Sequence, residues 1–149
     1  FGESSRRGAE LGFSWQLGEQ IAVDGSYSYI DSTEQGSDGE RDELRRPNHL
    51  ASLTLDWQAS DALQLNINLQ HSGSQIDQHF YSEGYDYFSP YVTLDAFTLL
   101  AINVNYAATD QLTVYAKATN AGGVHYEEVF GFSTPSRQLA VGVRYQWAK

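Results

Sequence analysis

Apolar and polar residues alternate along most of this chain with a period of two. The clearest stretch is 63–70, where leucine and isoleucine occupy the odd positions and glutamine and asparagine the even ones. The same alternation runs through 21–29 and 51–57, and less regularly through 9–17, 92–106, 112–120 and 138–147. Alternation of this kind is typical of β-strands with one apolar face. The pattern therefore predicts an all-β chain of seven strands without a helix.

The charged residues inside these stretches follow the same phase. All six fall on the polar side of the alternation: Glu10, Asp24, Asp56, Asp95, Lys117 and Arg144. This indicates which side chains share a face. It does not decide between a membrane barrel and a soluble sandwich, since both obey the rule.

The connections between the predicted strands are alternately short and long. Short breaks fall near 18–19, 60–61 and 109–110, and long ones cover 31–48, 72–91 and 121–136. Outer-membrane barrels have this asymmetry, with tight periplasmic turns and long extracellular loops. A soluble sheet has no reason to place every long loop at one end, so the pattern favours a transmembrane antiparallel β-barrel over a soluble β-sandwich binding module.

The short turns also carry an internal repeat. Trp15, Trp57 and Tyr106 each end a strand on the apolar phase, an acid-bearing turn follows, and an apolar residue restarts the alternation six places on. Trp147 lies in the same phase near the end of the sequence. Aromatic rings at one end of successive strands form the interfacial girdle of membrane barrels.

The strand count predicts that these residues are part of a larger barrel. If the short turns are periplasmic, the first strand enters from the extracellular side and residues 1–7 belong to a loop. Bacterial single-chain barrels have an even number of strands, at least about eight, so seven cannot close alone. The absence of methionine, and a start at Phe1 that resembles no signal peptide, agree with this expectation. We expect residues 1–149 to be the C-terminal segment of a barrel.

Composition narrows the function classes. The formal charge is −10, which argues against a nucleic-acid partner. No cysteine is present, which excludes a disulfide framework, a thiolate zinc site and a cysteine nucleophile. No apolar run approaches the roughly 20 residues of a transmembrane helix. The sequence also lacks the G-x-S-x-G, P-loop, G-x-G-x-x-G and H-E-x-x-H motifs.

Several short motifs, in order, resemble the barrels of TonB-dependent outer-membrane receptors. They are Gly8-Ala9-Glu10, Tyr27 to Asp31, Arg46-Pro47-Asn48-His49, 92–97, the series Asn120, Tyr126, Gly131, Pro135 and Arg137, and the ending 142–147. Within the family the segments 44–46, 55–58, 73–77 and 126–132 are most similar to vitamin B12 receptors. The chain departs from the family pattern at 121–123, at Ser136 and at Ala148-Lys149. The first two departures alter the last extracellular loop and leave the substrate open.

The resemblance implies the last seven or so strands of a plugged barrel of about 22 strands in the bacterial outer membrane. It implies energised uptake of a scarce metal chelate, either cobalamin or a ferric siderophore or haem, and no enzymatic activity. The implied partners are the rest of the barrel, an N-terminal plug, TonB acting through that plug, outer-membrane lipid including lipopolysaccharide, and the barrel-assembly machinery. Gly142, Tyr145 and Trp147 resemble the signal read by that machinery. A passive porin and an outer-membrane hydrolase remain alternatives.

Two sets of residues are candidates for the transport path. Aromatic rings crowd the long loops, and flat rings suit planar or macrocyclic ligands. The predicted ligand contacts are Arg45, Tyr81, Tyr85, Tyr87, Tyr126, Phe130 and Phe132. The predicted lumen lining is Asp24, Asp56, Asn66, Asn68, Asp95, Lys117 and Arg144.

The acidic residues suggest a further site. Eleven of the 19 lie in the three long loops, and the spacing of Asp38, Glu40 and Asp42 is compatible with Ca²⁺, which takes six to eight oxygen ligands. A solvated acidic rim explains the same residues, and no other cofactor is expected. His79 near Asp77, or His125 near Glu127, is the acid–base pair that the hydrolase alternative would use.

Overall fold

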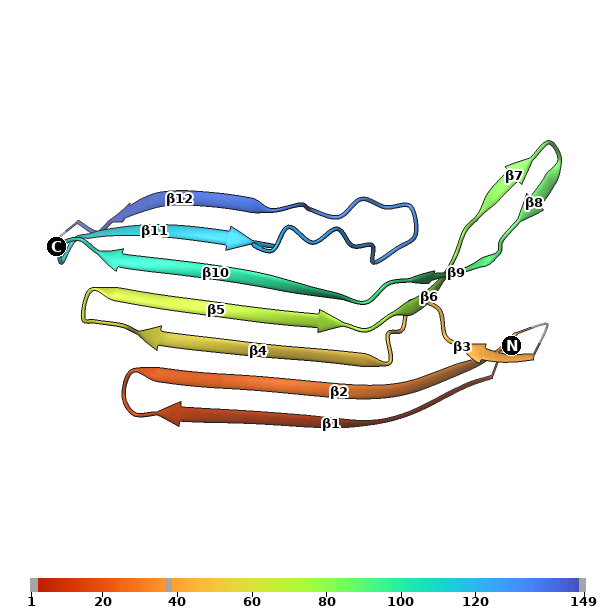
Figure 1. Cartoon of the computed structure of the whole chain (residues 1–149), viewed down its shortest axis with the longest axis horizontal. Helices are drawn as coiled ribbons and strands as arrows, with labels where there is room; N and C mark the ends of the chain where they lie inside the picture. Colours follow the sequence, from red (N-terminus) through yellow and green to blue (C-terminus); the bar gives the residue numbers. More distant parts are fainter. Residues whose placement is uncertain (1–2, 37–38, 148–149) are drawn as a thin grey trace.

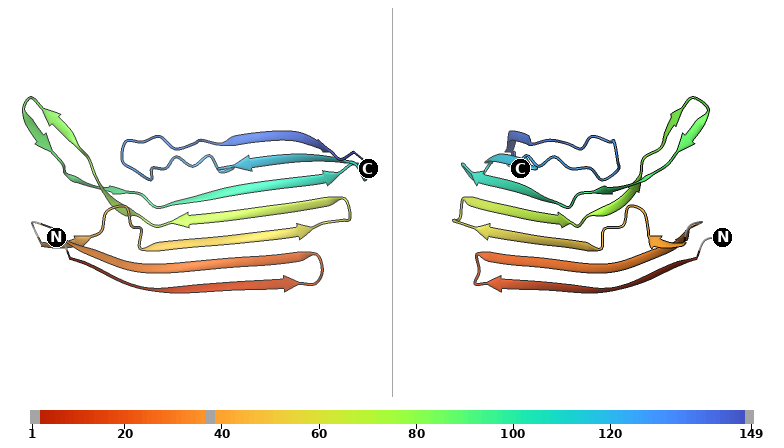
Figure 2. Two further views of the ribbon diagram at one scale, coloured as in Figure 1. Left: turned by 180° about the vertical axis from the view of Figure 1, so that it is seen from behind. Right: turned by 45° about the vertical axis from the view of Figure 1, so that its right-hand side comes forward.

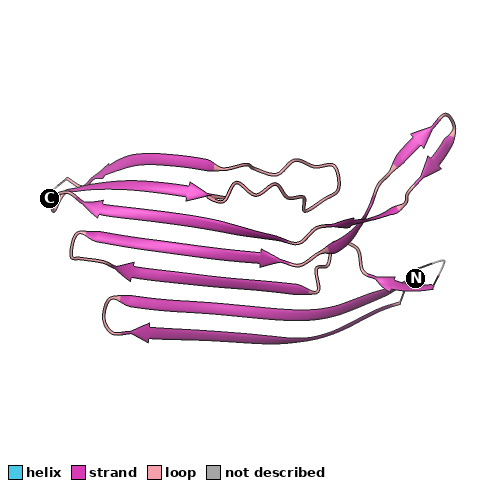
Figure 3. Ribbon diagram, in the orientation of Figure 1, coloured by secondary structure: helices cyan, strands magenta, loops and turns pink. Residues whose placement is uncertain are grey.

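The computed structural model describes residues 3–36 and 39–147, and strands are the only regular elements there (Figure 3). The long strands are β1 (Ser4–Leu17), β2 (Ile21–Gly36), β4 (His49–Gln58), β5 (Leu63–Ser72), β10 (Phe97–Ala107), β11 (Leu112–Thr119) and β12 (Gln138–Tyr145). The short ones are β3 (Gly39–Asp42), β6 (Gln75–Gln78), β7 (Tyr81–Glu83), β8 (Asp86–Phe88) and β9 (Tyr91–Leu94). No helix that could cross a membrane occurs in these residues.

The seven long strands form one antiparallel sheet in the order β1-β2-β4-β5-β10-β11-β12, with β3 paired to the far end of β2. The strands lie in a single layer, and the β7–β8 hairpin projects beyond it in each view (Figures 1 and 2). The short connections gather at one end, the turn end, and the long ones at the other, the loop end (Figure 1). The predicted seven-strand meander with alternating connections is confirmed, and a two-layer sandwich is not what the described residues form.

The pairing register separates the side chains into two faces. Across the sheet, Trp15 is aligned with Val23, Leu55, Ile67 and Ile102, so one face is apolar from edge to edge. That face has no covering layer, and large apolar side chains on it are exposed: Leu11 67%, Trp15 62%, Val141 78%. A soluble protein does not leave such an area open to water, whereas a lipid-facing sheet must.

The opposite face is polar and internally hydrogen-bonded. Asn66 donates to Asp56 (2.8 Å) and Asn103 donates to Asn66 (3.0 Å), while Asn68 donates to Thr54 (2.8 Å). The register places Asp24, Asp56, Asn66, Asn68, Lys117 and Arg144 on this face. Six of the seven residues predicted to line the lumen therefore share one surface, and their contact with a lumen stays a prediction.

Aromatic and histidine rings border the apolar face at both ends. At the turn end lie Trp57, Tyr106 and Tyr145; at the loop end Tyr27 donates to or accepts from His49 Nδ1 at 2.7 Å, and Tyr29 packs against the same ring. Trp57 and His49 are the two ends of one strand's apolar stretch, and at about 3.3 Å per residue they are about 26 Å apart. This matches the height of the apolar band of outer-membrane barrels, about 25 Å.

Two of the three short turns that share the sequence repeat also share one backbone structure. In the β4–β5 turn, Ser60 and Leu63 exchange backbone hydrogen bonds at 3.2 Å, and in the β10–β11 turn Thr109 and Leu112 do the same. The Ser60 and Thr109 hydroxyls accept from the amides of Ala62 and Gln111 inside the turns, each at 3.3 Å. A hydroxyl at this position satisfies amides that the tight turn leaves free.

Three sequence predictions about the loop end were wrong. Residues 72–91 were expected to be a loop, but they contain the short strands β6, β7 and β8. Residues 1–7 and 31–48 were also expected to be loops. Instead, β1 begins at Ser4 and pairs with β2 up to Glu34, and β3 pairs with the last residues of β2, from Thr33 to Gly36. Hydrophobic alternation stops there because the strands have left the apolar band, while backbone pairing continues. Ion pairs support the extension, including Arg41 with Glu34 at 2.8 Å.

The predicted strand 92–106 is two strands. It breaks at Asp95 and Ala96, so that β9 pairs with β6 while β10 pairs with β5 and β11. Asp95, predicted to line the lumen from within a strand, therefore lies in the connection between two ribbons. Alternation alone could not locate the break because the apolar phase continues through it.

We expect the two faces to respond oppositely to an added charge. Leu53→Arg places a guanidinium in the middle of the apolar band, at a cost of about 2–4 kcal/mol for a lipid-facing site. The matched control Ser14→Arg lies on the polar face opposite Asp24. In the full-length receptor, we expect Leu53→Arg to lower the heat-modifiable fraction on SDS gels and the urea midpoint, and Ser14→Arg to change neither. Equal losses would contradict the assignment of faces.

Candidate ligand-binding site

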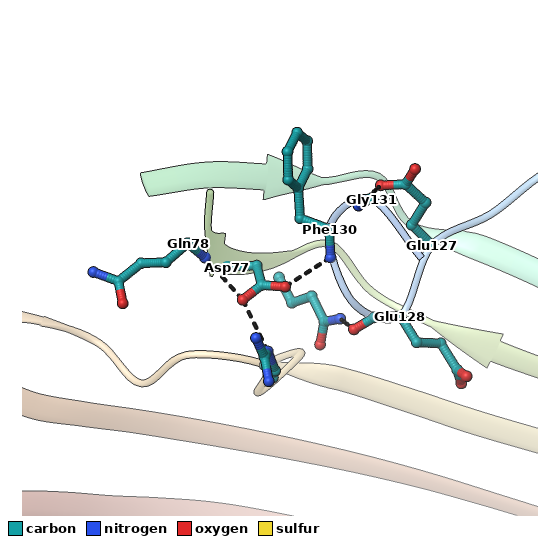
Figure 4. A network of polar contacts seen from close by, with 8 residues as sticks. Asp77, Gln78, Glu127, Glu128, Phe130 and Gly131 are labelled. Carbon is teal, nitrogen blue, oxygen red and sulfur yellow. Dashed lines mark hydrogen bonds and ion pairs between the residues drawn. The ribbon is translucent and has the colours of Figure 1, made fainter. Parts of the chain in front are cut away.

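Three long connections meet at the carboxylate of Asp77 on β6 (Figure 4). Its Oδ1 accepts from Arg45 Nε at 2.8 Å and from the amide of Gln78 at 2.8 Å. Its Oδ2 accepts from the amide of Phe130 at 2.8 Å. Asp77 is completely buried, so its charge is compensated entirely by these partners. We call this group of contacts the loop knot.

Strand β6 holds its neighbours through alternate residues. Gln75, Asp77 and His79 lie two residues apart and all reach the β11–β12 connection. Gln75 Nε2 donates to the Glu128 carbonyl (2.8 Å), Asp77 binds the Phe130 amide, and the His79 ring lies 4.7 Å from the Phe130 ring. A period of two places such residues on one side of a strand, which explains how a short β6 holds a long loop.

The β3–β4 connection is fixed from the other direction. The Arg45 amide donates to the Ile76 carbonyl at 2.8 Å while its side chain reaches Asp77, and Arg45 adopts a left-handed φ of 58° to do both. Hydrogen bonds from Phe130, Gln78 and Arg45 hold the pKa of Asp77 below its usual value, against the opposing effect of burial. The carboxylate is therefore ionised at neutral pH and the knot is closed.

A second ionic cluster joins β1 to the same connection. Glu43 accepts from Arg6 Nε at 2.8 Å and from its terminal nitrogen at 2.6 Å, and it also accepts from the hydroxyl of Ser32. Arg46 lies 3.5 Å away. The bonds from Arg6 and Ser32 lower the pKa of Glu43 from 4.5 to about 2. Bidentate pairing of this type fixes orientation as well as charge.

The last long connection has its own internal support. Asn120, 7% exposed, begins it with a left-handed φ of 46°. Its amide donates to the carbonyls of Val124 (2.8 Å) and Pro135 (3.2 Å), and its Oδ1 accepts from the Val124 amide. One side chain thus closes both ends of the 120–135 segment.

Two hollows adjoin the loop knot. Hollow A, about 480 Å³, is lined by the β9–β10 junction and the β11–β12 connection, including Asp95, Phe97, Tyr126, Glu127 and Phe130. Hollow B, about 570 Å³, lies mainly on the polar face and is lined by Arg45, Gln75, Phe97 and Glu128 among others. Phe97 borders both, with its ring 4.4 Å from that of Tyr126. Both hollows are of the size of small-ligand sites.

Only three of the seven predicted ligand contacts line one of these two hollows. Tyr126 and Phe130 line hollow A, and Arg45 lines hollow B with its guanidinium already bound to Asp77. Tyr81, Tyr85 and Tyr87 lie instead on the projecting β7–β8 hairpin, where Tyr85 at its tip is 99% exposed. Phe132 is 70% exposed and lines neither hollow. Ligand contact by each of these residues stays a prediction.

Other sequence-based candidates remain untested. Asp38 of the predicted Ca²⁺ site lies outside the described residues, and Glu40 accepts from Thr33 at 2.8 Å. The described part of the chain has no group of three or more acidic or histidine side chains arranged to hold a metal ion. In the predicted assembly signal, the Tyr115 ring covers Gly142 so closely that a β-carbon there would lie 2.4 Å from it. A larger residue at this position would displace the Tyr115 ring, and recognition of the signal stays a prediction.

The sequence did not single out the residues that organise the site. Asp77 was counted among the acids of a solvated rim and was also paired with His79 in the hydrolase alternative, and Gln75 was only part of a family resemblance. The alternation of Gln75, Asp77 and His79 was a usable signal, because three hydrogen-bonding side chains on one side of a short strand indicate a contact surface.

Comparisons with known proteins agree with this architecture. The sequence model described as "TonB dependent receptor-like, beta-barrel" matches residues 1–121. The iron-regulated outer membrane virulence protein of Vibrio cholerae serotype O1 is 28% identical over 144 residues, which are 95% of this chain and 21% of that protein. The chain thus spans about a fifth of the length of this curated relative.

Solved structures share the fold. The ferripyoverdine receptor of the Pseudomonas aeruginosa outer membrane matches with a TM-score of 0.78 and 17% identity over 95% of this chain and 19% of its own. The siderophore receptor PiuA of Acinetobacter baumannii gives 0.77 and 14%, over 97% and 22%. The ferric-catecholate import receptor Fiu of K12 E. coli gives 0.77 and 17%, over 97% and 21%.

A single sheet with a lipid-type outer face and structured loops at one end is part of an outer-membrane receptor barrel. The chain belongs to the TonB-dependent receptor β-barrel family. The predicted family, barrel fold and outer-membrane location are confirmed.

Removing the charge at the knot should loosen the β11–β12 connection. In Asp77→Asn the buried amide cannot accept from all three donors, and loss of such bonds costs about 1–3 kcal/mol. We expect hydrogen exchange at the Phe130 amide to rise by about 5- to 100-fold. Asp31→Asn, which removes an exposed carboxylate 3.7 Å from Arg7, is the matched control. Unchanged exchange in Asp77→Asn would contradict the knot.

The Glu43 cluster should fail in acid. Because the pKa of Glu43 in the fold, about 2, lies below its usual 4.5, its contribution is complete above pH 4.5 and is lost as the pH falls toward 2. We expect exchange at the Glu43 amide, bound to the Ser32 carbonyl at 2.9 Å, to accelerate in that window after correction for intrinsic rates. Glu43→Gln should remove the transition. A transition of the same size in both proteins would refute this assignment.

Proposed function

We propose that the full receptor imports a scarce metal chelate across the outer membrane, and that this segment supplies barrel wall and part of the ligand site. The observation that carries the proposal is the loop knot: in a TonB-dependent receptor barrel, it holds three connections around two aromatic hollows. A general porin needs an open channel and no such preorganised, ring-lined site.

The cargo we propose is a ferric chelate. Support comes from what related proteins are called: the relative in V. cholerae is iron-regulated, and PiuA and Fiu are siderophore and ferric-catecholate receptors. Three of the four segments that resemble vitamin B12 receptors, 44–46, 73–77 and 126–132, contribute residues to the knot. The fourth, 55–58, lies in β4 at the turn end of the sheet. The residues of the knot hold the loops together, so a resemblance there does not specify cobalamin.

The remaining partners follow from the mechanism of such uptake. A barrel whose lumen is plugged needs an energy source to move the plug, and in this family TonB would deliver it through the plug and not through these strands. Outer-membrane lipid would contact the apolar face, and the assembly machinery would act on β12. No enzymatic step is part of this proposal. The His79 ring packs against the rings of Tyr81 and Phe130, which gives it a structural role.

Energised uptake tests the proposal. Cells that lack their own iron and cobalamin receptors are supplied with the full-length receptor and given radiolabelled ferric siderophores, haem or cyanocobalamin. We expect saturable accumulation of a ferric siderophore that a protonophore or deletion of tonB abolishes. Uptake that persists without the proton gradient would indicate a porin, and cobalamin uptake alone would overturn the iron assignment.

A further inference from the structure

Hollow A combines aromatic rings with negative charge. Phe97, Tyr126 and Phe130 provide rings, and Asp95 and Glu127 provide the carboxylates of the lining. No lysine or arginine lines it. Arg137 of the same connection packs its guanidinium against Gly123, about 3.1 Å from where a β-carbon would lie, and is not part of the lining.

The two carboxylates are available to a ligand. Among the described residues neither Asp95 nor Glu127 forms an ion pair. Glu127 accepts a single long hydrogen bond, 3.3 Å from the Gly131 amide (Figure 4). By contrast Asp77, Glu43 and Glu34 are each bound by an arginine. The three acids that join the loops and strands here are each neutralised by an arginine, and the two that line hollow A are not.

The rings are held in place before any ligand arrives. Phe130 is anchored twice, by its amide on Asp77 and by its ring against His79, and Tyr126 leans on Phe97 at 4.4 Å. The Tyr126 carbonyl also accepts from the hydroxyl of Thr134. A preorganised site loses little entropy on binding. Ring faces attract cations and carboxylates repel anions, so both features of hollow A select the same sign of charge.

Among the described residues, hollow B offers no free positive charge that would attract an anionic ligand. Its arginine, Arg45, is engaged by Asp77, and its remaining charged group is Glu128. A tris-catecholate iron complex is strongly anionic and would meet like charge at both hollows. A trihydroxamate iron complex is neutral, and a pendant ammonium group makes it cationic.

We propose that hollow A selects a ferric chelate without net negative charge, and favours one with a pendant ammonium group that binds between Glu127, Asp95 and the rings of Phe97 and Tyr126. This rests on the proposed function and names the substrate class of that site. Ferric uptake by the receptor and selection by charge are separable claims, and one experiment distinguishes them.

The experiment compares three labelled iron complexes on cells with the full-length receptor. Ferrioxamine B is cationic through its free amine, N-acetylated ferrioxamine B has the same core without that charge, and ferric enterobactin is anionic. We expect TonB-dependent uptake in that order, with half-saturation about three- to tenfold lower for ferrioxamine B than for its acetylated form. Preference for ferric enterobactin overturns the charge proposal and leaves ferric uptake intact. Failure of all three complexes overturns both.

Substitutions in hollow A test whether this hollow causes the preference for a cationic complex. The double variant Asp95→Asn, Glu127→Gln should raise the half-saturation concentration of ferrioxamine B to that of its acetylated form, so that the preference between the two complexes disappears. Asp61→Asn, in the β4–β5 turn at the opposite end of the sheet, changes charge without touching the hollow and should leave the ratio unchanged. If the double variant retains the full preference, hollow A is not the site of selection.

Discussion

The structure depends on one requirement: every backbone amide and carbonyl that lies in the apolar band must be paired with another strand. The continuous register meets it for the strands between the two edge strands, β1 and β12, and the period-two alternation then turns one side of the whole sheet toward lipid. The long polar extensions of β1 and β2 obey the same pairing beyond the band, where Arg41 and Glu34 replace apolar contacts. Loops begin only outside the apolar band, where water can bind backbone groups that no other strand pairs with.

At the loop end, hydrogen bonds from side chains hold the segments together, as backbone pairing between strands does in the sheet. Asp77 is buried with three donors around it, and it joins connections that lie 32 and 53 residues away in sequence. Such a site is sensitive to a single atom, because a buried carboxylate that loses a donor retains its desolvation cost. The shape of the two hollows therefore depends on a few polar side-chain contacts, whereas the shape of the sheet depends on many backbone hydrogen bonds.

Sequence reasoning was accurate where one physical rule governed many residues. Alternation found all seven long strands, their faces and the repeated turns, because the lipid boundary acts on every residue of a strand. It failed at Ser4–Arg7 and at β3, where strands continue without an apolar face, and at Asp95, where the apolar phase runs across a break. It also missed Asp77, since burial of an acid by distant partners leaves no periodic trace in the sequence.

The strands end at different heights at the loop end of the sheet. β2 continues 13 residues beyond Val23, whereas β11 ends one residue beyond Ala118, which lies on the same cross-strand row as Ile102. On one side the wall above the membrane is paired backbone, and on the other it is the 120–137 segment, supported by Asn120 and the knot. A molecule arriving from outside therefore meets paired backbone on the β1–β2 side. On the β11–β12 side it meets a loop whose position depends on a few side-chain hydrogen bonds.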